Sequence, residues 1–166
     1  MCQYLSVDGA PNDWQLMHLG RLAIGGCGIV FGEETAVEPD GRKTHNCAGL
    51  YKQSHVASYR KITDMIRSNG ALPAIQLGHS GRKGSCHDAM RDWRALNNSD
   101  AENDLPPWQV MTPTAAISPP RPIPHKEMDQ DDINRVIDDF RTATKRSIDA
   151  GYDICLLYTS DAPTSG

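Results

Sequence analysis

Short apolar stretches alternate with amphipathic helical periods along this chain, and that alternation constrains the fold more than any other feature. Buried strands are expected at residues 28–31, 71–77 and 152–157. Helices are expected at residues 12–25, 54–70 and 129–151, one before each strand. Strands that alternate with such helices favour an α/β fold with a parallel sheet and right-handed connections. Three strands are too few for a complete open sheet or a closed barrel.

Local signals define the ends and faces of these helices. Caps are expected at Asn12 or Asp13, at Ser54 and at Asp129, and glycines follow each helix at 25–26, 70 and 151. The expected apolar faces are Trp14, Met17, Leu22 and Ala23 in the first helix; Val56, Tyr59, Ile62 and Ile66 in the second; and Ile133, Val136, Ile137, Phe140, Ala143 and Ile148 in the third.

Residues 84–128 show no clear period and are rich in proline. A structureless stretch of this length inside a compact domain is usually either functional or a misreading of the pattern. We therefore expect an excursion that covers the strand ends, with a short hairpin arm at residues 108–111.

Composition excludes several classes of protein. The net charge of −4 gives no indication of a nucleic-acid partner. No apolar run approaches the roughly 20 residues of a membrane span, and the N-terminus lacks the features of a signal peptide, so a cytoplasmic location is expected. The five cysteines are odd in number and none is in C-x-x-C spacing, so neither a disulfide framework nor a metal site is expected.

Residues 71–83 carry the strongest indication of a site. Gln76 lies inside an otherwise apolar strand, and burying an amide is costly unless a partner bonds it. His79, Arg82 and Lys83 follow the strand directly, where α/β proteins bind ligands. Two alternatives stay open: a core amide bonded to a neighbouring strand end, and a salt-bridged turn built from His79 and Arg82.

With these elements in order, the chain resembles the old yellow enzyme family of FMN-dependent NADH:flavin oxidoreductases and ene-reductases, specifically its bacterial, thermophilic-like branch. Four segments carry the resemblance: Met-Cys-Gln-Tyr at 1–4, Glu-Thr-Ala-Val-Glu-Pro-Asp-Gly-Arg at 34–42, Ile-Gln-Leu-Gly-His-Ser-Gly-Arg-Lys at 75–83 and Ala-Gly-Tyr-Asp at 150–153. Their order and spacing make the resemblance specific, although each segment alone is weak.

The resemblance implies a partial (β/α)8 TIM barrel, roughly strands two to four with their helices and a long excursion after strand three. Residues 1–154 would be the N-terminal part of the barrel, with FMN at the carboxyl ends of the strands. Gln76 would bond the flavin pyrimidine edge, Cys2 would contact the ring near its reactive nitrogen, and Met1 would contribute backbone contact. Tyr4 would line the substrate pocket. Without the resemblance, Cys2 is a small buried hydrophobe and Tyr4 is ordinary packing.

The sequence departs from the family pattern in two places. Glu34 stands where the family commonly has a small residue, so only a backbone contact to the flavin is expected there. The pair of substrate-binding histidines that normally follows Gly-Tyr-Asp is missing, and residues 155–166 are expected to be a non-native tail. No catalytic residue is therefore assigned. With so much of a barrel missing, we expect the isolated chain neither to fold stably nor to bind FMN tightly.

The activity that the resemblance implies is reduction of the activated C=C of α,β-unsaturated carbonyl compounds, with NAD(P)H as hydride donor and a homo-oligomeric parent protein. An alternative is a flavin reductase or hydroxylase domain acting on unsaturated or aromatic acyl-CoA thioesters, since residues 86–108 could suit a larger substrate. An alternative of another class is a non-catalytic module that binds a partner through the proline-rich residues 106–124.

Overall fold

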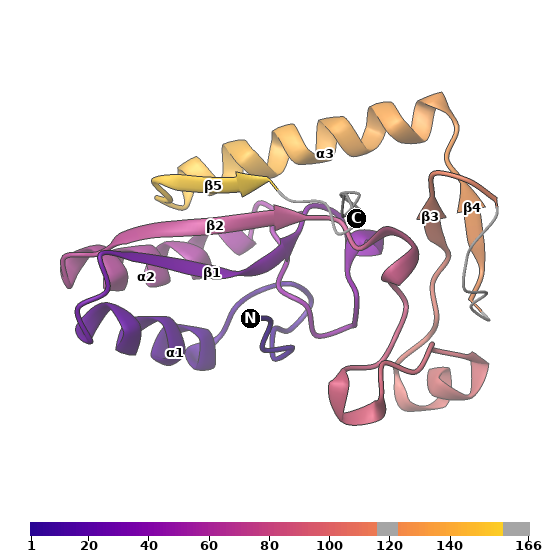
Figure 1. Cartoon of the computed structure of the whole chain (residues 1–166), viewed down its shortest axis with the longest axis horizontal. Coiled ribbons are helices and arrows are strands. Elements are labelled where there is room, and N and C mark those ends of the chain that lie inside the picture. Colours follow the sequence, from indigo (N-terminus) through magenta and orange to yellow (C-terminus); the bar gives the residue numbers. More distant parts are fainter. Residues whose placement is uncertain (116–122, 158–166) are drawn as a thin grey trace, which may run out of the picture.

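The computed structural model describes residues 1–115 and 123–157 (Figure 1). The helices and strands run in the order α1 (Asp13–Ile24), β1 (Ile29–Ala36), α2 (His55–Ser68), β2 (Leu72–Gly78), β3 (Val110–Thr112), β4 (His125–Glu127), α3 (Gln130–Asp149) and β5 (Ile154–Leu157). No helix among the described residues is long and apolar enough to cross a membrane.

The main sheet has the strand order β1-β2-β5, and both strand pairs are parallel. This confirms the expected α/β fold, in which each strand is preceded by a helix. Because the strands are parallel, their carboxyl ends all lie at the same end of the sheet (Figure 1). The first three residues of the segment expected to be a non-native tail belong to β5, and residues 158–166 lie outside the described residues.

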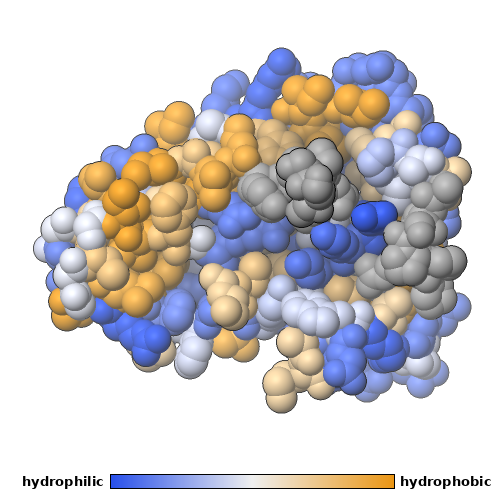
Figure 2. Space-filling model, viewed as in Figure 1, coloured by the Kyte–Doolittle hydropathy of each residue, from blue (hydrophilic) through white to orange (hydrophobic). Residues whose placement is uncertain are grey.

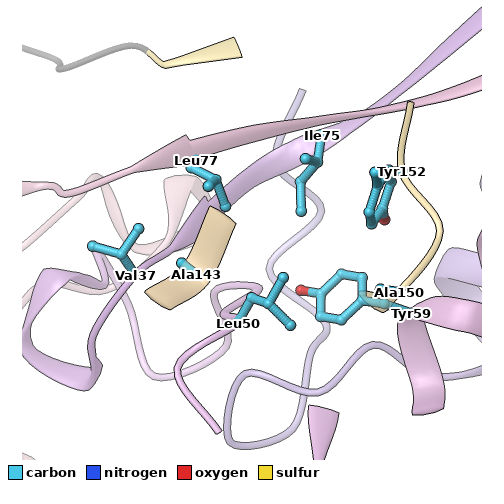
Figure 3. Packing of buried hydrophobic residues seen from close by; sticks show 8 residues of the cluster. All are labelled: Val37, Leu50, Tyr59, Ile75, Leu77, Ala143, Ala150 and Tyr152. Carbon is cyan, nitrogen blue, oxygen red and sulfur yellow. The ribbon is translucent and has the colours of Figure 1, made fainter. Parts of the chain in front are cut away.

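The helices cover one face of this sheet. Ile75 and Leu77 of β2 are fully buried and pack with Tyr59 of α2 and Ala143 of α3 (Figure 3). A second cluster joins Val30 of β1 to α1 and α2. Burial of each large aliphatic side chain contributes about 1.5–3 kcal/mol, so this face holds most of the stabilising contacts.

The opposite face is bare, and we call it the bare face. Neighbours in the register lie on the same side of a sheet, and Ile29, Phe31, Leu72 and Leu156 of this side are exposed by 48, 46, 47 and 44%. Figure 2 shows hydrophobic residues gathered over this part of the molecule, in the left half of the view. The bare face is therefore an apolar surface that the described residues leave uncovered.

β1 is longer than the predicted strand at residues 28–31, and a β-bulge interrupts it. Phe31 pairs with Ala74 and Glu34 pairs with Gln76, so the stretch around Gly32 and Glu33 carries an extra residue. Without the bulge, Phe31 and Glu34 would point to opposite sides; with it, both belong to the bare face. The bulge therefore turns the Glu34 carboxylate toward the same side as Gln76.

Two of the three predicted N-cap residues cap their helices in the structure. Asn12 and Asp129 cap α1 and α3, each with a capping box. Ser54 was expected to cap α2, but its backbone is already helical and its side chain makes no cap bond, so that expectation is wrong.

The expected apolar faces were partly wrong. Trp14 and Met17 are exposed, whereas Ala23 is buried as predicted, together with Gln15 and Leu19, which were not predicted. In α3, Ile133, Ile137 and Ile148 stay substantially exposed although the helix itself is as predicted. In both α1 and α3, the face that carries apolar residues is wider than the surface that packs against it.

The excursion lies at the carboxyl ends of the strands, as expected (Figure 1). The hairpin arm predicted at residues 108–111 is wrong, because β3 pairs with β4 in parallel. A hairpin requires antiparallel strands, and a longer connection joins β3 to β4. Part of that connection, residues 116–122, lies outside the described residues.

Candidate functional site

Three of the predicted site residues line one small cavity at the carboxyl end of β1. Cys2, Tyr4 and Glu34 share it with Arg42 and Lys43 from the following loop, and its volume is about 10 Å³. A space of that size holds about one water, so a large ligand could contact only the surface around it. The structure therefore brings Cys2 and Tyr4 together with Glu34, the residue at which the sequence departs from the family pattern.

The N-terminal segment is fixed beside β1 by polar contacts. The Gln3 backbone N–H donates to the Glu33 carboxylate at 2.8 Å, and the Trp14 indole N–H donates to the Gln3 amide oxygen at 3.2 Å. Ser6 N–H donates to the Asn46 carbonyl at 3.1 Å. These bonds place Cys2 and Tyr4 next to the carboxyl end of the strand.

The side chain of Glu34 extends over the end of β2. One carboxylate oxygen lies only 2.6 Å from the position that a Cβ on Gly78 would occupy, so a larger residue at 78 would displace it. Sequence reasoning assigned only a backbone contact to Glu34, whereas in the structure Glu34 lines the cavity and its carboxylate reaches over Gly78.

Gln76 is the register partner of Glu34 and lies on the bare face, half-buried near the carboxyl end of β2. Within residues 1–115 and 123–157 no group is hydrogen-bonded to its amide. The amide therefore offers a donor and an acceptor to a ligand on the bare face. The alternative, a core amide bonded to a neighbouring strand end, has no support in this part of the chain.

Met1 is not brought to this cavity. It is fully exposed and lines a different cavity, between α1 and the bulge of β1, together with Gln3 and Glu33. The predicted backbone contact of Met1 with a cofactor stays a prediction.

Burial and acidic neighbours perturb the site chemically. Burial raises the pKa of the Cys2 thiol, and the carboxylates of Glu33 and Glu34 raise it further. Burial also raises the pKa of Tyr4, with smaller contributions from the Cys2 and Cys47 thiols. Both groups are therefore held protonated, so Cys2 is a neutral thiol and Tyr4 is a hydrogen-bond donor.

His79 forms part of a structural bracket. Its Nδ1 accepts the Gly81 N–H at 2.9 Å, so Nε2 carries the proton and donates to Glu38 at 2.7 Å. Arg135 of α3 pairs with the other oxygen of Glu38. Burial acts to raise the pKa of Glu38, but the bond from His79 and the charge of Arg135 outweigh it and lower that pKa. His79 thus ties β2, the loop after β1 and α3 together, which supports the bracing role for His79; the part of Arg82 in such a turn stays a prediction.

Arg42 was not singled out from the sequence, yet it joins the site to the excursion. Its guanidinium lies 5.6 Å from the Trp108 ring centroid and 5.8 Å from that of Tyr51. The Trp108 indole N–H donates to the Asp40 carbonyl at 3.1 Å. The signal in the sequence that could have pointed to Arg42 was its position in the segment Gly-Arg-Lys at residues 41–43, after a strand.

These features fit a flavin at its pyrimidine edge. That edge presents donors and acceptors, which the amide of Gln76 can answer. The apolar bare face beside Gln76 suits the ring, and the neutral Cys2 thiol places no charge next to it. The Glu34 carboxylate is a feature that would oppose an anionic reduced flavin.

The sequence profile of the NADH:flavin oxidoreductase / NADH oxidase family matches residues 1–162. The chain belongs to this family. An NADH:flavin oxidoreductase of Gibberella zeae is 33% identical over 164 residues, which are 96% of this chain and 38% of that protein. An NADPH dehydrogenase of Bacillus velezensis is 28% identical over 96% of this chain and 42% of its own length. The chain thus spans about two fifths of these relatives.

Similar solved structures agree in fold. A 2-naphthoyl-CoA reductase in complex with 2-naphthoyl-CoA superposes with a TM-score of 0.76 at 24% identity, covering 95% of this chain and 23% of that chain. The old yellow enzyme of Pichia sp. AKU4542 gives 0.74 at 18% identity, covering 95% and 40%. Our chain is therefore a partial TIM barrel, as the sequence predicted.

Proposed function

We propose that this chain is the N-terminal part of an FMN-dependent oxidoreductase that takes hydride from NAD(P)H and reduces the activated C=C of α,β-unsaturated carbonyl compounds. The observation that supports it best is the amide of Gln76, which no group among the described residues bonds, beside Glu34 on the bare face. Membership of the NADH:flavin oxidoreductase family supports the same chemistry.

Each site residue has a task in this proposal. Gln76 holds the cofactor by its pyrimidine edge, and Cys2 and the backbone at Glu34 and Met1 contact the ring system. Tyr4, held protonated, donates a hydrogen bond to the substrate carbonyl or packs against the substrate. A bound FMN supplies the hydride chemistry, while the protein supplies position and electrostatics. The reaction consumes NAD(P)H and a proton for each alkene reduced.

The test uses the full-length protein encoded by the reading frame that contains this chain. Purified protein should carry an equimolar amount of FMN, visible in its absorption spectrum. It should oxidise NADH or NADPH under anaerobic conditions when cyclohexenone is added, with formation of cyclohexanone. Protein that contains no flavin and binds none on addition would contradict the proposal and favour a non-catalytic module that binds a partner through residues 106–124.

A second candidate substrate is an unsaturated or aromatic acyl-CoA thioester. The excursion supports it, because Trp93 contacts the ring of Tyr4 with centroids 5.3 Å apart and so extends the site beyond the strand ends. One protein of similar fold, the 2-naphthoyl-CoA reductase, was solved with such a thioester. Comparing turnover of cyclohexenone with that of an unsaturated acyl-CoA separates the two candidates.

A further inference from the structure

The bulge of β1 carries two consecutive glutamates, and they line different cavities. Glu34 lines the small cavity at the candidate site. Glu33 lines the cavity between α1 and the strand, which has a volume of about 90 Å³ and also borders Gln15 and Leu19 of the helix. Glu34 therefore faces the candidate site, whereas Glu33 faces the segments that support it.

The Glu33 carboxylate holds the backbone of the N-terminal segment. One of its oxygens accepts the Gln3 N–H at 2.8 Å. Burial raises the pKa of the Glu33 carboxyl. The bond from the Gln3 backbone opposes this shift most, followed by bonds from the Gln15 side chain and the Tyr4 backbone. Hydrogen bonds to an ionised carboxylate are stronger than those between neutral groups, so Glu33 is a firm anchor for residues 3 and 4.

The anchored segment contains a strained residue. Tyr4 has a left-handed backbone with φ at +53°. For a residue with a Cβ this conformation costs free energy, and it persists only where surrounding contacts fix it. Such contacts lie on both sides of Tyr4: Glu33 binds the Gln3 N–H before it, and Ser6 N–H donates to the Asn46 carbonyl at 3.1 Å after it. Without Glu33, the turn at Tyr4 loses one of its two supports.

This turn determines where two groups of the candidate site lie. Cys2 and Tyr4 both line the small cavity at the carboxyl end of β1, and the Tyr4 ring meets Trp93 edge-on with centroids 5.3 Å apart. The charge of Glu33 also acts on Cys2, because it raises the pKa of the thiol and is second only to burial among the causes. A change at Glu33 therefore reaches both side chains from outside their cavity.

We propose that Glu33 is a positioning residue for the reaction. By holding the backbone at Gln3 it fixes the left-handed turn at Tyr4, and that turn sets the positions of the Tyr4 hydroxyl and the Cys2 thiol at the site. The inference rests on the proposed function and adds a residue that acts through the backbone of its neighbours. A glutamine at 33 keeps an acceptor oxygen for this task, whereas a leucine has none.

Alkylation of Cys2 tests the anchoring without requiring turnover. In the full-length protein, E33Q removes the charge and keeps the acceptor, so iodoacetamide should react a few-fold faster than with the wild type. E33L removes both at similar volume, so release of the segment should expose the thiol and raise the rate by roughly tenfold more. Mass spectrometry of the peptide that contains Cys2 measures the rates, and E102Q, at an exposed glutamate, should react like the wild type. Equal rates in E33L and E33Q would overturn the proposal.

A double-mutant cycle tests whether Glu33 acts through Tyr4. Y4A and E33L should each lower kcat/KM for cyclohexenone by roughly tenfold. The double variant should lose about the same factor as Y4A alone, because the ring that Glu33 positions is already absent. E33Q should keep most of the activity. Losses that multiply to roughly a hundredfold in the double variant, or wild-type kcat/KM in E33L, would overturn the proposal.

The proposed function and this inference fail in different ways. A full-length protein without flavin and without alkene reduction contradicts the proposed function, and the alkylation rates of E33Q and E33L still test the anchoring of Cys2. Normal alkene reduction with multiplying losses contradicts the role of Glu33 alone. Circular dichroism identifies variants that unfold, and E33A, which removes the acceptor without adding an apolar side chain, makes the same test if E33L unfolds.

Discussion

The two faces of the same three-stranded sheet differ in how they are used. On the covered face, Ile75 and Leu77 are fully buried beneath the helices. On the bare face, Phe31 and Leu72 are about half exposed, although Phe31 follows the buried Val30 along β1 and Leu72 belongs to the same strand as Ile75 and Leu77. The covered face packs into a core over β1 and β2, and the bare face is an apolar surface with polar groups only at its carboxyl end.

This contrast separates stability from function within single strands. In a TIM barrel the outer side of each strand packs on helices and the inner side fills the barrel, while the site lies at the carboxyl ends. The bare face has the composition of such an interior, and Glu34 and Gln76 stand where the site would be. We therefore predict that the bare face is buried in the full-length protein.

Truncating one leucine on each face tests this prediction most severely. In the full-length protein, L77A should lower the free energy of unfolding by about 2–5 kcal/mol, and L72A should cost a similar amount because the barrel interior covers it. L5A, which removes an exposed leucine outside the sheet, should change it by less than about 0.5 kcal/mol. Urea unfolding measures all three.

The same experiment can contradict the comparison. If L72A costs no more than L5A in the full-length protein, the bare face stays open to solvent and is not a barrel interior. In that case the contrast between the faces would have another origin.

The bracket of His79, Glu38 and Arg135 joins the carboxyl ends of the strands to α3 on the covered face. E38Q should therefore lower the free energy of unfolding by about 1–3 kcal/mol. The pKa of Glu38 is lowered in the folded state, so its contribution is full above its ordinary value of 4.5 and is lost as the pH falls through the lowered value. Urea unfolding between about pH 6 and about pH 3 should therefore show a shallower pH dependence for E38Q. E102Q, at an exposed glutamate of the excursion, should keep the wild-type slope; a shared slope for E38Q and wild type would contradict the role of Glu38.

The smallest expected effect concerns the thiol at the site. Glu34 contributes to the raised pKa of Cys2, so E34Q should lower that pKa and increase the thiolate fraction. At about pH 8, alkylation of Cys2 by iodoacetamide should then be a few-fold faster than in the wild type. Mass spectrometry of the modified N-terminal peptide measures the rate, with E102Q as the control. An unchanged or slower rate would show that the Glu34 carboxylate does not face Cys2.

Features set by neighbouring residues were predictable from the sequence. Asn12 and Asp129 cap their helices because a side chain reaches only the next turn, and the parallel sheet follows from the order of the elements. The family motifs supplied Cys2, Tyr4 and Glu34, which the structure brings into one cavity.

Features that join distant residues were not predictable in this way. The pairing of β3 with β4 depends on the path of the whole excursion, and the bracket joins Glu38 to Arg135, far along the chain. The bulge in β1 changes the side to which Glu34 points, and a shift of one residue leaves no mark in the apolar pattern. Trp93 gained meaning only when the fold placed it beside Tyr4.

The central claim is that the carboxyl end of the bare face holds a flavin through Gln76. The direct test is a titration of the full-length apoprotein with FMN, followed by quenching of flavin fluorescence, for the wild type, Q76L and Q53L. Q76L removes the amide at nearly constant volume and should weaken FMN binding by roughly tenfold, because the pyrimidine edge loses its partner. Q53L, at an exposed glutamine before α2, should bind like the wild type. FMN affinity in Q76L equal to that of the wild type, or no FMN binding by any of the three, would contradict the account.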